Sequence, residues 1–229
     1  TLINVASGTY SWPTSIYGAN EIRILGTTSS FDAMVGNWTV VSSSRPDGSI
    51  VDATFSNTYA EDELKGTFIH LSSSLYPAGW IYANEASDGG STRVYFTCDD
   101  GPENLPVDNT FLSLVNLDTK LEPDQYVIES KISNCTNFKL KNLHFRTPEF
   151  SSGHVTSGSP YNEAYVRWEF GTYGALQCKF GNDHSVSYNA FSKVLVAHGT
   201  NHFWTCYFRM KARDTADAND RTVYCGDNG

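Results

Sequence analysis

The stretch VAHGTNHFWTCYFRM, residues 196 to 210, places His198, His202 and Cys206 at intervals of four residues. Imidazole and thiolate groups are ligands for zinc, and on a helix this spacing brings them to one face. The residues between the two histidines, GTN, favour a turn instead. We therefore predict a hairpin with the histidines as cross-strand neighbours and Cys206 too far along the strand to share a metal with them. The histidines are then structural or touch a ligand, and no metal site is expected.

A second group of candidate residues consists of Trp and Tyr side chains in turn-rich, polar stretches. Exposed aromatic rings beside Asn, Asp and Ser stack on and hydrogen-bond to sugars, and they also anchor protein partners. The group comprises Trp12, Tyr17, Tyr76, Trp80, Tyr82, Tyr161 and Tyr173. Our predicted ligand-binding set is Trp12, Tyr17, Trp80, Tyr82, Tyr173, Arg167, Lys179, His198 and His202.

The two basic members of that set come from YVRWEFGTYGALQCKF, residues 165 to 180, which can be paired as a hairpin with a loop over residues 171–175. This register places Trp168 opposite Cys178 on an apolar face. Arg167 then lies opposite Lys179 on the other face, with Glu169 diagonal to the lysine. Two interpretations stay open: a solvated sheet face with a diagonal ion pair, or a seat for an anionic sugar or carboxylate.

Acidic residues gather in two places where they could serve catalysis or calcium binding. Glu122, Asp124 and Glu129 could supply the paired carboxylates of glycoside hydrolysis, although a solvated turn explains the first two better. The segment TCDDGPEN, residues 97 to 104, suits calcium by ligand type but lacks EF-hand spacing. The sequence contains no P-loop, dinucleotide-binding glycine motif or G-x-S-x-G motif. We expect no cofactor, with calcium as the alternative.

Charge and composition narrow the partners. The chain has 229 residues, with 16 basic and 25 acidic side chains and a formal net charge of −9. This balance repels a phosphate backbone, so nucleic acid is not an expected partner. No apolar stretch approaches the roughly 20 residues that span a bilayer, so membrane insertion is not expected. The odd count of 5 cysteines favours a reducing compartment, whereas sequons at Asn37 and Asn134 favour the secretory pathway.

The elements that must position these residues are almost all strands. Apolar residues alternate with period two in segments such as EIRILG, QYVIESKI and KVLVA, and turn-forming clusters separate these segments. The best helical candidate, residues 59–66, is at most two turns long. We predict an all-β chain: one antiparallel domain over residues 1–229, a β-sandwich, jelly-roll-like or squashed barrel with long loops. The serine-rich segment 151–160 is a surface loop and the best internal cut site, and the chain ends suggest a mature form or an excised domain.

Two classes of function fit this pattern. The first is a recognition module exposed on a cell or virion surface that binds a glycan or a protein receptor, as lectin domains and the protruding attachment domains of non-enveloped virus capsids do. The alternative is a jelly-roll polysaccharide lyase acting on an acidic, uronate-containing polymer, with His202, Tyr207, Arg209, Lys179 and Gln177 as its catalytic group. The absence of a catalytic motif favours the recognition module, and a homodimer is compatible with either class.

Overall fold

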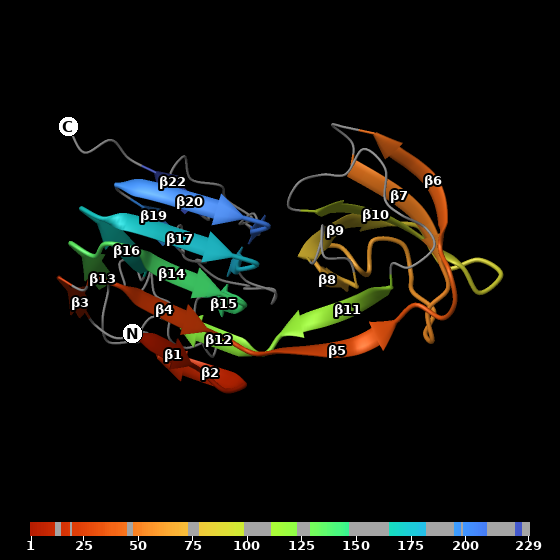
Figure 1. The fold of residues 1–229 in the computed structure, drawn as a ribbon. Coiled ribbons are helices and arrows are strands. Elements are labelled where there is room, and N and C mark those ends of the chain that lie inside the picture. Colours follow the sequence, from red (N-terminus) through yellow and green to blue (C-terminus); the bar gives the residue numbers. More distant parts are fainter. Residues whose placement is uncertain are drawn as a thin grey trace, which may run out of the picture. The chain divides into compact units, whose positions relative to one another are not determined.

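The computed structural model describes the chain in segments, and its regular structure there is entirely strand (Figure 1). The described residues are 1–11, 15–18, 20–44, 48–72, 78–98, 111–122, 129–146, 165–181, 195–197, 199–209 and 223–225. They form two compact units. The first unit contains Thr1–Thr27 and Leu117–Gly229, and the second contains Thr28–Asn116.

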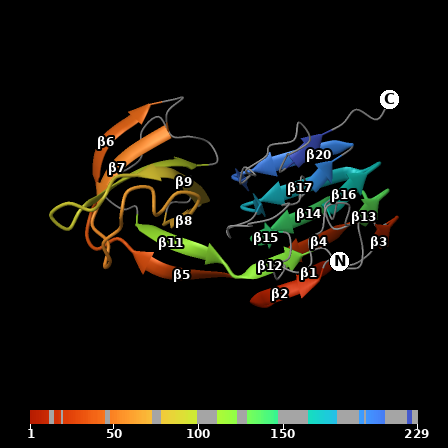
Figure 2. The same ribbon diagram turned by 180° about the vertical axis from the view of Figure 1, so that it is seen from behind.

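The first unit is built from three sheets whose strands are all parallel (Figures 1 and 2). Successive strands along the chain go to sheet 1, sheet 2 and sheet 3 in turn, and this cycle is completed five times. Sheet 1 contains β1 (Leu2–Asn4), β4 (Ile22–Leu25), β14 (Phe138–Lys141), β17 (Thr172–Leu176) and β20 (Thr200–Trp204). Sheet 2 contains β2 (Gly8–Ser11), β12 (Thr119–Glu122), β15 (Leu143–Phe145), β18 (Lys179–Gly181) and β21 (Tyr207–Arg209). Sheet 3 contains β3 (Ser15–Tyr17), β13 (Glu129–Ser133), β16 (Tyr165–Glu169), β19 (Leu195–Ala197) and β22 (Val223–Cys225). In its described residues, the unit is therefore a parallel β-helix of five coils.

Single residues in the left-handed conformation turn the chain between sheets. Asn142, Gln177 and Thr205 occupy equivalent corners between sheets 1 and 2, with φ of 58°, 50° and 47°. The first two corners bond to the next coil: the Asn142 amide donates to Leu176 O (3.2 Å) and the Gln177 amide to Trp204 O (3.0 Å). These backbone bonds hold residues other than glycine in a conformation that L-residues adopt at a cost.

In-register stacking of the coils builds the core of the first unit. Phe145, Phe180 and Phe208 occupy one inward row of sheet 2. Their rings are stacked, with centroids 5.0 Å apart for Phe145–Phe180 and 5.2 Å for Phe180–Phe208. Trp168 of sheet 3 stacks on Tyr173 and Phe203 of sheet 1, at 5.4 and 5.8 Å. Equivalent positions thus place ring on ring at about the 4.8 Å spacing of neighbouring strands.

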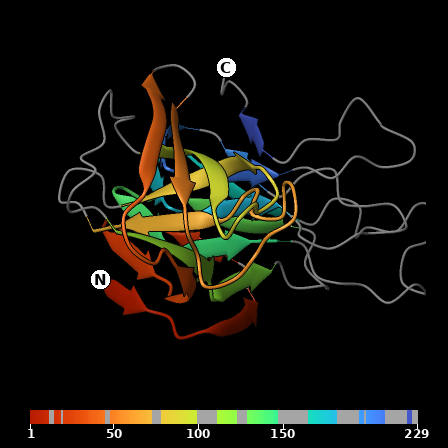
Figure 3. The same cartoon turned by 90° about the vertical axis from the view of Figure 1, so that its right-hand side faces the viewer.

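The second unit is inserted between β4 and β12, at a corner of the second coil. It is a seven-stranded antiparallel sheet, drawn in orange to yellow-green in Figure 3. The strand order is β5 (Thr28–Ala33), β11 (Leu112–Leu117), β8 (Phe68–Leu71), β9 (Ala78–Asn84), β10 (Thr92–Cys98), β7 (Gly48–Ala53) and β6 (Thr39–Ser44). One face of the sheet packs against Trp38, Phe55 and Leu64 from connecting segments, with the sheet residues Ile69, Ile81, Val94 and Phe96 buried beneath them.

Two threonines close the corner from which the insertion leaves. The Thr27 amide donates to Thr119 Oγ1 (2.9 Å), and the two hydroxyl oxygens lie 3.1 Å apart. The Thr119 hydroxyl also donates to Ala6 O of the first coil (2.9 Å), and the Asp118 amide donates to Thr27 O (3.0 Å). We call Thr27 and Thr119 the threonine clasp.

A buried carboxylate organises the loops of the second unit. Asp32 is 7% exposed and accepts hydrogen bonds from the amides of Ala33 (2.7 Å), Ser56 (3.2 Å) and Asn57 (3.0 Å) and from the Tyr59 hydroxyl (2.6 Å). Burial alone raises the pKa of Asp32, but the hydrogen bonds, led by that from Tyr59, outweigh it and hold the pKa below its ordinary value.

The structure confirms an all-β chain and corrects the pairing of its strands. The jelly-roll and barrel forms of the prediction are not confirmed; antiparallel pairing holds in the second unit, whereas the first unit is parallel. The hairpin predicted over residues 165–180 is wrong, because β16 pairs with β13 and β19 while β17 pairs with β14 and β20. The hairpin predicted around GTN is wrong for the same reason, since β19 and β20 belong to different sheets. Residues 61–66 form turns rather than the predicted helix, and the segment 151–160 lies outside the described residues.

We predict that Phe180→Ala destabilises the first unit far more than Phe208→Ala. Phe180 is fully buried between two stacked rings, so its truncation costs about 3–5 kcal/mol. Phe208 is 41% exposed and has a described ring neighbour in the stack on one side only. Urea unfolding followed by circular dichroism measures both variants, and equal losses would contradict the stacked core.

We predict that Asp32→Asn lowers the free energy of unfolding at neutral pH by about 1–3 kcal/mol, because an amide cannot accept all the bonds made to the carboxylate. The folded-state pKa is depressed, so the stabilisation is complete above the unfolded-state pKa, near the ordinary value of 3.8, and is lost as the pH falls through the folded-state pKa. Unfolding of the variant should therefore depend less on acid than unfolding of the parent. The control is Asp88→Asn, an exposed position in the same unit. Parallel acid profiles for Asp32→Asn and the parent would rule out this role.

Candidate functional site

Alternation along β9 and β10 gives the antiparallel sheet a second, aromatic face. Ile81, Val94 and Phe96 are fully buried on the core side. Between them, Trp80, Tyr82, Arg93 and Tyr95 take the opposite face and are half-buried. The register between the two strands shifts between Tyr95 and Phe96, which leaves Tyr82 as the extra residue of a β-bulge.

Three of these side chains form a continuous row, which we call the aromatic row: Trp80, Tyr82 and Tyr95. The Trp80 and Tyr82 rings meet edge to face with centroids 6.4 Å apart. The Tyr82 and Tyr95 rings are tilted by 55° at 6.0 Å. Both distances fall within the range of favourable aromatic pairs, so the rings support one another in a defined arrangement.

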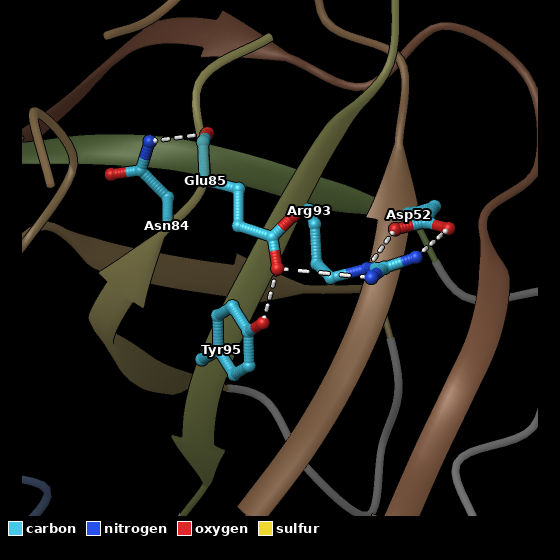
Figure 4. A network of polar contacts seen from close by, with 5 residues as sticks. All are labelled: Asp52, Asn84, Glu85, Arg93 and Tyr95. Carbon is cyan, nitrogen blue, oxygen red and sulfur yellow. Dashed lines mark hydrogen bonds and ion pairs between the residues drawn. The ribbon is translucent and has the colours of Figure 1, made fainter. Parts of the chain in front are cut away.

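A polar network borders the row at Tyr95 (Figure 4). The Tyr95 hydroxyl donates to Glu85 Oε1 (2.5 Å), and the same carboxylate lies 3.7 Å from Arg93 Nη1. Arg93 donates to both carboxylate oxygens of Asp52, from Nε (2.8 Å) and Nη2 (3.0 Å). The Asn84 side chain donates to the Glu85 carbonyl oxygen (2.9 Å), which holds the backbone of Glu85 directly after the end of β9.

The network alters the proton affinity of its members. The hydrogen bond to Glu85 is the main cause that raises the pKa of Tyr95, since ionisation would place two negative charges together. Asp52 raises the pKa of Arg93 in the same way, by hydrogen bonding to the charged guanidinium. Two carboxylates and one guanidinium leave this border with a net negative charge, and its oxygen atoms are acceptors for hydroxyl donors.

The aromatic row combines two predicted residues with one that sequence reasoning missed. Trp80 and Tyr82 belong to the predicted ligand-binding set, and the structure brings them together. Tyr95 was not included because it lies in a strand rather than in a turn-rich stretch. The alternation in TRVYFTC, residues 92–98, was the available signal, since it puts Tyr95 on the face opposite to Val94 and Phe96.

The predicted exposure of Tyr173 is wrong. Its side chain is 1% exposed in the core of the first unit, and its hydroxyl donates to the carbonyl oxygens of Glu169 (2.5 Å) and Ile132 (3.1 Å). Burial is the main cause that raises its pKa to about 12. A residue without accessible surface cannot contact a ligand, so Tyr173 is a core residue.

The remaining members of the predicted ligand-binding set lie in the first unit. Tyr17 is 77% exposed in β3, and His202 is exposed in β20 with its ring stacked on Trp204 at 5.3 Å. The Lys179 ammonium lies 5.7 Å from the centre of the Tyr207 ring. Arg167 is described by its backbone position in β16, opposite Lys131 and Val196. Trp12 and His198 lie outside the described residues.

The predicted lyase group does not share one face. His202 is on sheet 1, whereas Lys179, Tyr207 and Arg209 are on sheet 2. Gln177, at the corner between these sheets, is 1% exposed. The five residues are therefore distributed over two sheets and a buried corner.

The predicted acidic sites are similarly dispersed. Glu122 forms an ion pair with Arg146, in which Glu122 Oε1 lies 2.6 Å from Arg146 Nε. Asp124 lies outside the described residues, and only the backbone of Glu129 is described. The calcium candidates Asp99, Asp100 and Glu103 of the segment 97–104 also lie outside the described residues. Within the described segments, no group of three or more His, Cys, Asp or Glu could hold a metal ion, and the Cys206 thiol donates to Ala175 O (3.3 Å). No helix in this part of the chain is long and apolar enough to cross a bilayer.

Comparison with known proteins gives no family. No protein-family model matches the chain, and no curated protein matches it significantly. Among solved structures, the chain is similar to the Gp54 tailspike of Acinetobacter baumannii bacteriophage AP22, solved in complex with A. baumannii capsular saccharide. The two share 9% identity with a TM-score of 0.25, over 92% of this chain and 47% of the tailspike. The chain thus spans less than half of that protein, and a TM-score this low supports no inference about fold or function.

We predict that Glu85→Gln lowers the pKa of Tyr95 toward its ordinary value of 10.0, because the hydrogen bond loses its charged acceptor. Stability should change little, since the Glu85 side chain is 54% exposed. Ultraviolet titration of the phenolate measures the shift, with Tyr95→Phe identifying the contribution of this tyrosine. Identical titrations of the variant and the parent would contradict the network.

Proposed function

We propose that the protein is a surface-exposed recognition module that binds a glycan on the aromatic row. The observation that carries the proposal is the adjacency of Trp80, Tyr82 and Tyr95 on one sheet face, bordered by Glu85, Arg93 and Asp52. Aromatic rings stack on the apolar faces of sugar rings, and neighbouring carboxylates and guanidinium groups bond to their hydroxyls. This pairing of surfaces suits carbohydrate better than an apolar ligand.

The charge of the border favours a neutral glycan. Asp52 and Glu85 both lie at Arg93, which leaves one negative charge in excess, and the whole chain carries −9. Carboxylate-bearing sugars would be repelled here, whereas hydroxyl groups find acceptors. We further propose that the module faces the outside of a cell or virion, binds its glycan free or on a protein receptor, and needs no metal for binding.

The test is a glycan array probed with the full chain, followed by titration calorimetry on the best neutral oligosaccharide. Trp80→Ala and Tyr82→Ala should each weaken binding roughly tenfold, equivalent to about 1.4 kcal/mol of lost stacking. Tyr17→Ala, a highly exposed tyrosine in the first unit, should leave the affinity unchanged. A metal chelator should also have no effect.

Two outcomes would reject the proposal. One is failure to retain any neutral glycan at millimolar concentration. The other is retention that Trp80→Ala and Tyr82→Ala leave intact while both variants keep the parent's circular dichroism spectrum. Light scattering on the same samples tests for the homodimer that is compatible with this class of function.

A further inference from the structure

We propose that the outer face of sheet 1 is a second saccharide site, selective for acidic glycans of the uronate class. It lies in the first unit and shares no residue with the aromatic row. The proposal of this second site can therefore succeed or fail independently of the neutral-glycan proposal.

The parallel register fixes which side chains reach this outer face. One row contains Leu2, Arg23, Lys139, Gly174 and His202, and the next contains Asn4, Leu25, Lys141, Leu176 and Trp204. The alternate residues Ile24, Leu140 and Ala175 are buried in the core, which confirms the direction of the two rows. The two rows contain three basic residues and a histidine, and neither contains an acidic residue.

The last two coils provide an aromatic platform on this face. The Trp204 side chain is 49% exposed, and His202 stacks on it with the rings inclined by 15°. The indole leans back over Gly174, because a Cβ added there would lie 3.1 Å from Trp204 Cζ3. The same added Cβ would lie 3.8 Å from Lys139 Cγ, so the Lys139 side chain also lies beside Gly174. Gly174 thus lets the ring lie close to the sheet, while Trp204 as a residue stays 49% exposed.

Two lysines supply positive charge beside the platform. Arg23 is already paired with Glu21, whose Oε1 lies 2.7 Å from its Nη2. Lys139 is exposed and Lys141 half-buried, and neither forms an ion pair with another described residue. Positive charge gathered on one face of a chain of net charge −9 marks the place where an anion can approach.

The spacing of the face suits a polymer rather than a single anion. Neighbouring coils are about 4.8 Å apart, so Lys139 and His202, two coils apart in one row, are separated by roughly 10 Å. The Cα atoms of Lys139 and Lys141, two residues apart on the same strand, are separated by about 7 Å. A chain of sugars lying across the coils could stack on Trp204 while its carboxylates meet the two lysines.

The experiment compares an oligogalacturonate with the same oligosaccharide after reduction of its carboxylates to alcohols, by titration calorimetry on the full chain. We expect the acidic form to bind more tightly by at least about tenfold, and to bind less tightly as salt is added. The double variant K139Q/K141Q and the variant Trp204→Ala should each weaken binding of the acidic form roughly tenfold, with partial recovery in Trp204→Phe.

Matched controls separate this site from the first. Lys65→Gln, which removes an exposed charge from the second unit, and Trp80→Ala, which disrupts the aromatic row, should leave oligogalacturonate affinity unchanged. The proposal is overturned by equal affinity for the acidic and reduced forms, by no binding at millimolar concentration, or by binding that K139Q/K141Q and Trp204→Ala leave intact. Loss of oligogalacturonate binding in Trp80→Ala would show that the acidic ligand binds at the aromatic row, and this result would also overturn the proposal. Circular dichroism checks the folding of each variant.

Discussion

Main-chain hydrogen bonding between successive coils is the constraint on which the first unit depends. Each strand pairs in parallel with the equivalent strand of the coil before or after it, so a side chain's row is set by its position in the coil. The ring-on-ring stack through Phe180, the inward Ile24 and Leu140, and the outward Lys139 and His202 are consequences of that one register. A shift of one residue in a single coil would exchange its inner and outer side chains.

The sequence was sufficient to predict strands and the direction of many side chains, because period-two alternation is a local property. It was insufficient for the pairing of strands. An antiparallel hairpin over residues 165–180 buries Trp168 and Cys178 together, and the parallel β-helix buries both as well, so the apolar pattern could not distinguish the two. The turns were equally hidden, because Phe170 and Gln177 adopt positive φ without being the Gly or Asn that usually signals it.

The candidate sites show the same division between local and long-range information. Trp80 and Tyr82 were found because they flank polar turns, and their mutual contact follows from alternation along one strand. Lys139 and Trp204 lie two coils apart and come together through strand pairing that no local pattern predicts. The two candidate sites also differ in charge: the border of the aromatic row is acidic, whereas the outer rows of sheet 1 are basic.

The threonine clasp has a consequence for how such a chain can diversify. Because Thr27 and Thr119 complete the corner with their own hydrogen bonds, the second coil is closed by residues outside the inserted segment. The β-helix can then act as a fixed scaffold, and the inserted segment from Thr28 to Asn116 can be exchanged without loss of this corner. Replacing the segment from Thr28 to Asn116 would leave the hydrogen bonds among Thr27, Thr119 and Ala6 in place, whereas a one-residue insertion within a coil would disturb the register of the coils stacked on it.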